Sequence, residues 1–394
     1  MGLSTLLARE EPRLRALPHV TGVGRGLKIS GGQVTDREAL VVFVSAKVPL
    51  AELSPGQVIP REVYDIEGAY RTDVVVARDM VALGSLNPEP HRQRQRPLVG
   101  GLSVMRGPLP GAGTLGGIVL KDGVAHGVSN AHVIYPNWIQ GPFAPVLGEP
   151  IYQPAGLDGG NFEGFADKVG ELTGGELVTP GGQAEEYDIA DFRITVPWEP
   201  LVLGIGAVRG LGQAQLGQRV TASGRSSGAS TGQVRYLDVS LDIGGYGGPT
   251  PTRFVGLIGL TDWTSRPGDS GAWLMAEDTL VGIVFAGGPD MALALSAPKV
   301  FAKRGYALPP PPNGVSLEEV FNPIWDLLVK AWGWDNRNRT WRSYDTQAPQ
   351  LRDLWFLEKG MVLDVTVSQD TSITLGGITW PLKAGQKNWV GWTS

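Results

Sequence analysis

The sequence predicts a mainly β protein that is divided into several domains. The chain has 394 residues, which is enough for two or three domains of ordinary size. It contains 56 Gly and 30 Pro residues, and both residue types favour a turn-rich, strand-based architecture over a helical one. Short apolar segments recur at close spacing between the glycines, a pattern typical of antiparallel barrels or sandwiches.

The N-terminal part predicts a helix followed by a small α/β domain. Residues 1–17 are expected to form an amphipathic helix, because charged residues such as Arg9 and Glu10 interrupt the apolar core that a secretory signal requires. Residues 18–90 are expected to form the domain, and "KISGGQVT" is typical of a hairpin. The stretch "GVGRG" does not indicate a nucleotide site, because a hairpin rather than a helix follows it.

Residues 98–305 contain short strand-like segments such as "GTLGGIVL", "QRVTASG" and "LVGIVFAGG". Residues 306–333 are expected to form a Pro-rich linker and a helix, which starts with a capping-box pattern at Ser316 and Glu319. Residues 334–394 predict a Trp-rich β module. We interpret its large rings as the core of a small module, and leave a sugar-stacking or partner surface as the alternative.

Composition excludes several classes of protein. A net charge of −5 provides no broad basic field for nucleic acid, and we interpret the basic run "HRQRQRP" at 91–97 as a solvated linker. The absence of cysteine excludes disulfides and thiolate chemistry. No run approaches the roughly 20 apolar residues that a membrane span needs. Without a signal peptide, we expect a cytoplasmic protein or a component of a larger assembly such as a phage.

Three short segments carry the candidate catalytic residues. Ser270 lies in "RPGDSGAWL", where glycines permit a sharp bend, and a serine nucleophile needs a neighbouring base and oxyanion donors. Asp188 lies among apolar and aromatic residues in "EEYDIADFRI", where a shielded carboxylate needs a partner such as an imidazole N–H. His132 in "NAHVI" is therefore the expected base between them. Asp191 and His126 are the rival acid and base.

The order of these residues and their contexts, "SNAHV", "YDIADF" and "PGDSGAW", resembles chymotrypsin-fold (trypsin-like) serine peptidases. The segments "GVGRGLKISGGQVT", "ALVVFVSAKVP" and "SGRSSGASTGQV" more closely resemble a family of bacterial and plant trypsin-like proteins that includes the plant narrow-leaf proteins. The resemblance covers approximately residues 18–305. It implies a trypsin-like double β-barrel, in which two six-stranded barrels enclose the site in the cleft between them.

The resemblance also implies roles for the candidate residues. His132 is the general base and then the acid, Asp188 orients it, and Ser270 is the nucleophile. Gly268, Asp269 and Ser270 form the oxyanion-hole loop, with the amides of Gly268 and Ser270 as donors. In many relatives the residue that matches Asp269 pairs with an N-terminal amine freed by processing. No such amine is evident here, so we expect an enzyme that is independent of processing or is assembled by oligomerisation.

The resemblance assigns the specificity pocket to four residues. Thr264 would form its floor, and Phe285, Ala286 and Gly287 would line its wall and pair with the substrate backbone. Asp262 is the alternative to Thr264 if the alignment shifts.

The sequence therefore predicts a serine endopeptidase that acts on polypeptides through an acyl-enzyme. No cofactor or metal is expected, because no histidine and carboxylate spacing suggests a metal site. The alternative is a non-catalytic structural or binding component built on a protease scaffold. A homo-oligomer and a partner for the C-terminal module are both left open.

Overall fold

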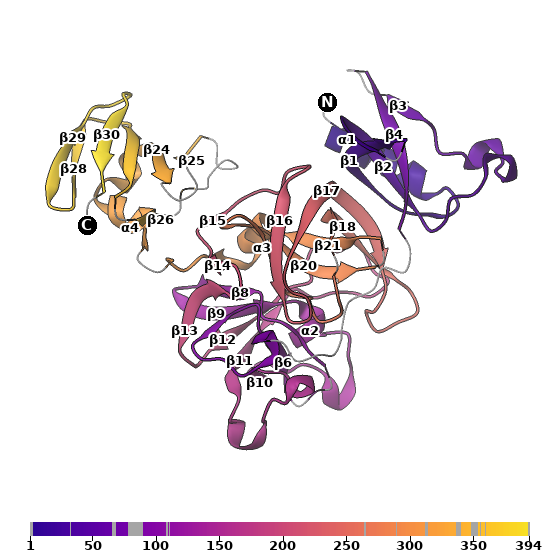
Figure 1. Ribbon diagram of the computed structural model, residues 1–394, viewed down its shortest axis with the longest axis horizontal. Helices are drawn as coiled ribbons and strands as arrows, with labels where there is room; N and C mark the ends of the chain where they lie inside the picture. Colours follow the sequence, from indigo (N-terminus) through magenta and orange to yellow (C-terminus); the bar gives the residue numbers. More distant parts are fainter. Residues whose placement is uncertain are drawn as a thin grey trace.

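The computed structural model describes residues 3–31, 33–64, 68–77, 90–107, 109, 111–263, 265–288, 290–311, 314–335, 340–347, 354, 356–358 and 360–392. The protein is mainly β, as predicted. Two barrels lie at its centre, with the N-terminal domain on one side and the C-terminal module on the other (Figure 1). No helix in the described ranges has the length and hydropathy needed to cross a membrane.

The N-terminal domain packs one helix on a small sheet. Its elements are α1 (Leu3–Arg15), β1 (Val20–Ser30), β2 (Gln33–Val44), η1 (Leu50–Glu52), η2 (Pro55–Gln57), β3 (Glu62–Tyr64) and β4 (Ala69–Val76). The strand order is β1-β2-β4-β3. The helix buries Leu6, Leu7 and Leu14 against Val23 and Val42 of the sheet, because these leucines lie on one side of the helix.

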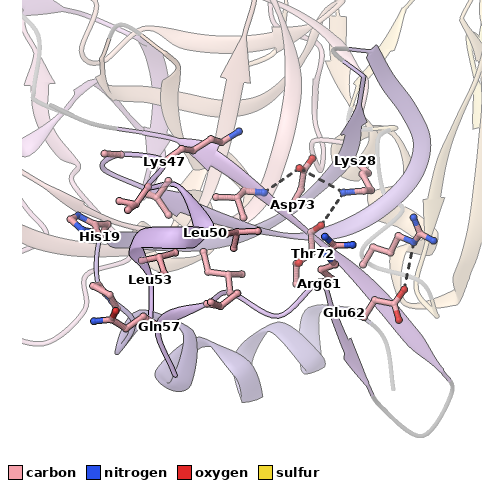
Figure 2. Close-up of a pocket in the computed structure, with 18 residues that line it drawn as sticks. His19, Lys28, Lys47, Leu50, Leu53, Gln57, Arg61, Glu62, Thr72 and Asp73 are labelled. Atoms are coloured by element: carbon pink, nitrogen blue, oxygen red, sulfur yellow. Dashed lines mark hydrogen bonds and ion pairs between the residues drawn. The ribbon is translucent and has the colours of Figure 1, made fainter. Parts of the chain in front are cut away.

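A cavity of about 640 Å³ lies in this domain beside β4 (Figure 2). Leu50 and Leu53 line one part of it, and Lys28 lines another. Figure 2 shows the Lys28 ammonium group directed at β4, where it donates to the Thr72 carbonyl at 3.0 Å and lies 3.8 Å from Asp73. None of the predicted catalytic residues lines this cavity.

The first barrel contains six strands, with the order β8-β9-β12-β11-β10-β6. They are β6 (Ser103–Arg106), β8 (Gly117–Lys121), β9 (Val124–Ser129), β10 (Pro150–Tyr152), β11 (Lys168–Gly175) and β12 (Ala190–Ile194). The short β7 (Gly113–Thr114) pairs with β6 and leads through two residues into β8 at the other end of this order. The helix α2 (Ala131–Ile134) and the turns η4 (Gly141–Phe143), η5 (Gly156–Asp158) and η6 (Glu163–Phe165) connect the strands.

The second barrel is a closed ring of six strands, because β16 pairs with both β19 and β17 at the ends of the order β16-β19-β20-β21-β18-β17. The strands are β16 (Arg219–Gly224), β17 (Gly228–Ile243), β18 (Thr252–Thr261), β19 (Trp273–Ala276), β20 (Thr279–Gly287) and β21 (Ala292–Ser296). β17 also pairs with β1, so one sheet continues from the barrel into the N-terminal domain.

Short elements surround the two barrels. They are η3 (Pro90–Arg92), β5 (Leu98–Gly100), β13 (Trp198–Val202), β14 (Gly206–Ala207), β15 (Gly210–Leu211), α3 (Ala297–Arg304) and β22 (Tyr306–Ala307). The prediction of a solvated linker at 91–97 is wrong for its first two residues. His91 and Arg92 are buried, because Ser223 Oγ lies 2.9 Å from the His91 ring and the Arg225 carbonyl accepts a bond from Arg92.

The C-terminal module is a separate set of strands with its own core. Its elements are β23 (Gly314–Ser316), α4 (Leu317–Phe321), η7 (Asn322–Leu327), β24 (Leu328–Asp335), β25 (Thr340–Asp345), β26 (Phe356–Glu358), β27 (Val362–Val367), β28 (Thr371–Leu375), β29 (Ile378–Leu382) and β30 (Asn388–Gly391). Four strands form a sheet with the order β25-β24-β27-β30. Leu363, Val365 and Val390 bury one face of that sheet in the module core.

Candidate active site

His132 and Asp188 form a close pair in the first barrel. His132 lies in α2, and Asp188 lies two residues before β12. The His132 Nδ1 atom is 2.5 Å from Asp188 Oδ2, and the His132 backbone N–H donates to Asp188 Oδ1 at 3.0 Å. The neighbouring Asn130 amide donates to the Asp188 carbonyl. These bonds fix the imidazole with Nδ1 toward the carboxylate and Nε2 away from it.

Tyr246 supplies a further donor that the sequence did not indicate. Its hydroxyl donates to Asp188 Oδ2 at 2.7 Å, and its buried ring makes edge contacts with His132 and Trp138. Tyr246 lies in the glycine-rich loop between β17 and β18, and no partner for Asp188 could be read from "GGYGG". A Cβ at Gly247 would lie 2.3 Å from Trp138, so this loop needs a glycine to pack here.

The charges of this pair follow from burial and from its hydrogen bonds. Burial alone would raise the pKa of Asp188, but the charge of His132 and the bonds from His132 and Tyr246 outweigh it and hold that pKa below its ordinary value. Burial, and then the negative charge of Asp188, raise the pKa of Tyr246 well above its ordinary value. The carboxylate therefore stays ionised and the phenol stays protonated near neutral pH.

The segment that contains Ser270 belongs to the second barrel but contacts the first. The Thr114 N–H donates to the Ser270 carbonyl at 2.8 Å, and the Thr114 hydroxyl donates to the Gly268 carbonyl at 2.6 Å. Gly271 has a φ of +101°, and a Cβ there would lie 2.7 Å from the hydroxyl of Ser129. Because Ser129 comes three residues before His132, these contacts bring the serine turn to the start of α2.

The serine hydroxyl is not bonded to the imidazole. Ser270 is fully buried, and its Oγ donates to the Phe285 carbonyl at 3.0 Å. His132 Nε2 is buried and has no hydrogen-bond partner among the described residues. A free Nε2 can accept a proton, and a turn of the Ser270 side chain about its Cα–Cβ bond changes the direction of Oγ.

The backbone around Ser270 presents two free amides. Among the described residues, no hydrogen bond uses the N–H of Gly268 or Ser270 as its donor. The amide of Asp269 differs, because it donates to the Arg266 carbonyl at 3.0 Å. Gly268 has a φ of +100°, a conformation that L side chains rarely adopt.

The Asp269 carboxylate is fully buried and is held by the chain itself. It accepts bonds from the N–H groups of Ser226 and Ser227 at 3.0 Å, from the Ser227 hydroxyl at 2.5 Å and from the Arg266 N–H at 2.8 Å. Four donors satisfy a buried carboxylate. The Asp269 side chain is therefore paired without an N-terminal amine.

A buried ion pair joins the two barrels beneath this turn. Arg225, in the loop between β16 and β17, donates through Nε and Nη2 to both carboxylate oxygens of Asp158 at 2.6 and 2.7 Å. Asp158 belongs to η5 of the first barrel and also accepts a bond from Ser103. A Cβ at Gly268 would lie 2.7 Å from the Arg225 guanidinium, so the pair directly supports the serine turn.

The predicted specificity residues lie at the end of β20. Phe285, Ala286 and Gly287 are buried, and β21 pairs with this segment on one side. The pairing of β19 with β20 ends at Ile283, so among the described strands the other edge of this segment has no partner. Thr264 lies outside the described residues, and Asp262 has a φ of +57°.

The two rival residues have other partners. Asp191 accepts bonds from Tyr306 at 2.6 Å and from Arg304, in a buried network on the first barrel. Burial would raise its pKa, but Arg304, Thr173 and Tyr306 hold that pKa below the ordinary value. The His126 ring bonds the Val124 carbonyl. In the described part of the chain, no three His, Asp or Glu side chains gather as a metal site.

Neither family models nor curated proteins match this sequence. Several solved structures are similar. Thermobifida fusca protease A is 17% identical, with 53% of this chain and 97% of that chain covered and a TM-score of 0.39. The α-lytic protease homologue N4 is 20% identical, with coverages of 54% and 99% and a TM-score of 0.40. Cellulomonas bogoriensis chymotrypsin is 19% identical, with coverages of 54% and 97% and a TM-score of 0.38. The two six-stranded barrels, the first carrying the histidine and aspartate and the second the serine turn, give this chain the chymotrypsin fold of trypsin-like serine peptidases.

Proposed function

We propose that this protein is a serine endopeptidase in which Ser270 is the nucleophile, His132 the base and Asp188 the residue that orients the base. The observation that carries this proposal is the His132–Asp188 pair with its free Nε2 atom, because β9, which ends three residues before His132, approaches the Ser270 turn at Ser129. Imidazole in this tautomer can take a proton from a serine hydroxyl. A carboxylate behind it stabilises the imidazolium that forms.

The reaction starts with a rotation of the Ser270 side chain. Its Oγ leaves the Phe285 carbonyl and donates to His132 Nε2, and the substrate carbonyl carbon then receives the attack of Oγ. The proton passes to His132, and the free amides of Gly268 and Ser270 bond the oxyanion. Return of that proton to the leaving amine gives the acyl-enzyme, which water hydrolyses. The unpaired edge at Phe285–Gly287 is suited to pair with an extended substrate backbone.

A fluorophosphonate probe tests this proposal, because it forms a covalent bond only with an activated serine. We expect stoichiometric labelling of the full chain and loss of the label in Ser270→Ala and in His132→Ala. Turnover of a peptide substrate by Ser270→Ala is expected to fall roughly a millionfold. Ser265→Ala is the matched control, since it removes a hydroxyl from the same loop and leaves the labelling unchanged.

One observation favours the alternative, a binding or structural protein without hydrolytic activity. Ser270 is fully buried, and its hydroxyl bonds a carbonyl instead of the imidazole. Absence of serine-dependent labelling over pH 6 to 9, from a protein that is shown to be folded, would establish this alternative and reject the peptidase.

A further inference from the structure

The C-terminal module carries an exposed aromatic face. Trp332, Trp341 and Trp389 expose 43%, 40% and 54% of their surface. Trp341 makes ring contacts with Trp334 at 5.4 Å and with Trp389 at 5.8 Å between centroids. The prediction that the large rings form the core of the module is therefore wrong for the three exposed side chains. Large exposed apolar patches mark interaction sites.

Strand register places these rings on one side of the sheet. Trp334 lies opposite Trp341, and Trp332 lies opposite Asp364, which in turn lies opposite Trp389. Side chains of directly opposed residues share a face, and Trp332 and Trp334 share one because they are two residues apart. The other side of the sheet is the buried aliphatic core. We call the exposed side, made of Trp332, Trp334, Trp341, Asp364 and Trp389, the tryptophan face.

The charges on this face are paired with each other. The Lys387 ammonium lies 3.5 Å from Asp364, and the Lys330 ammonium lies 2.7 Å from Asp345. Each pair sums to zero, so neither of these described pairs leaves an uncompensated positive charge for a phosphate or an acidic ligand. A nucleic-acid site would instead need uncompensated cations beside its aromatic rings.

Asp364 adds a hydrogen-bond acceptor in the middle of the face. It is only 7% exposed, and its Oδ1 atom has no hydrogen-bond partner among the described residues. A buried acceptor without a donor is costly, so a ligand that brings a donor gains from satisfying it. An apolar side chain of a protein partner would leave this oxygen unsatisfied, whereas a hydroxyl group would bond it.

We propose that the tryptophan face binds a neutral polysaccharide chain. The faces of the indole rings carry the negative part of the ring quadrupole, which attracts the polarised C–H groups of a pyranose. The exposed rings of Trp332 and Trp389 lie on either side of Asp364 in the sheet, so a sugar that stacks on either ring brings its hydroxyl groups close to this carboxylate. The site is independent of the proposed peptidase chemistry, because it shares no residue with it.

Calorimetric titration of the full chain with neutral hexasaccharides tests the proposal. The probes are the hexaoses of β-1,4-glucan, β-1,4-xylan, β-1,4-mannan, α-1,4-glucan and chitin. We expect at least one hexaose to bind the parent chain. Its affinity for Trp332→Ala and for Trp389→Ala should be at least tenfold lower than for the parent, and its affinity for Asp364→Leu should also be lower. The control Tyr64→Ala removes an aromatic ring that is 63% exposed in the N-terminal domain and leaves binding unchanged.

Two results would overturn the proposal. One is that no hexaose at millimolar concentration gives a heat of binding with the parent chain, while circular dichroism shows that the parent and the variants are equally folded. The other is self-association of the chain in sedimentation that Trp332→Ala and Trp389→Ala abolish, because the face would then be an interface between two copies. Labelling by fluorophosphonate is unaffected in either case.

Discussion

At the scale of single residues, the chemistry of the candidate site depends on how Asp188 is held. Its carboxylate accepts three bonds, two from His132 and one from Tyr246, while it is fully buried. A buried carboxylate that lost one donor would keep its desolvation cost with less compensation. Tyr246 is thus a positioning residue for the imidazole–carboxylate pair.

We predict that Tyr246→Phe lowers kcat/KM about 10-fold, a loss of about 1.4 kcal/mol of transition-state stabilisation. Without the phenol, the buried Asp188 carboxylate loses one of its three donors and orients the imidazole less firmly. The value of kcat/KM is measured with a peptide substrate.

The chain offers a matched control in Tyr306, whose hydroxyl donates to the buried Asp191 at 2.6 Å. Both phenols help to lower the pKa of a carboxylate, and such a carboxylate stabilises the fold above its unfolded pKa and loses that contribution as pH falls. On acidification, Tyr246→Phe and Tyr306→Phe should therefore both unfold at a higher pH than the parent protein does. An equal loss of kcat/KM in Tyr306→Phe would contradict the role of Tyr246.

The sequence predicted that His132 and Asp188 pair, as they do, but it did not indicate the surroundings of the pair. His132 and Asp188 could be selected because short local contexts distinguish them from His126 and Asp191. Tyr246 lies 58 residues after Asp188, and no local pattern links a tyrosine in a glycine loop to a distant carboxylate. The direction of the Ser270 hydroxyl was equally unpredictable, because one side-chain rotation changes its partner.

At the scale of elements, the two barrels meet where β8 packs on β19. A Cβ on Gly117 would lie 2.4 Å from the Trp273 ring, and one on Gly116 would lie 2.2 Å from the Gly271 carbonyl. Two adjacent glycines thus let a buried tryptophan and the serine segment approach the first barrel. The glycines in "GTLGGIVL" indicated strands and turns, but the sequence did not indicate that they contact Trp273 and Gly271 of the second barrel.

We predict that Gly117→Ala lowers the free energy of unfolding by about 1–3 kcal/mol, the usual cost of overpacking a filled core. Because Trp273 lies three residues after Ser270, labelling by the fluorophosphonate should slow as well. Denaturant unfolding and the labelling rate are the two measurements. Gly56→Ala, where a Cβ meets nothing within 4 Å, is the control and should change stability by less than about 0.5 kcal/mol. Equal effects of the two substitutions would contradict this packing.

At the scale of the whole molecule, one sheet connects the N-terminal domain to the second barrel. β17 is 16 residues long and pairs with β16 and β18 in the barrel and with β1 outside it. The sequence predicted mainly β structure, and the fold agrees. It did not predict this continuity, because pairing between strands about 210 residues apart leaves no local pattern.

We predict that deletion of residues 1–77 destabilises the second barrel and promotes aggregation. The deletion exposes the edge of β17 that β1 covers, from Tyr236 to Leu241, and an uncovered edge strand pairs readily with other chains. Thermal unfolding and light scattering report the effect. Deletion of residues 314–394 is the comparison, since the described strands it removes are not continuous with the barrel sheets, and it should aggregate less. Greater aggregation of the C-terminal deletion than of the N-terminal deletion would refute the prediction.

The distribution of the candidate residues between the barrels has a consequence for biosynthesis. A ribosome makes the six strands of the first barrel, with His132 and Asp188, before it adds Ser270. Under the proposed function, a nascent chain therefore has no nucleophile until the first barrel and three of the six strands of the second have been made. The order of synthesis then shortens the period in which an incomplete chain could digest itself.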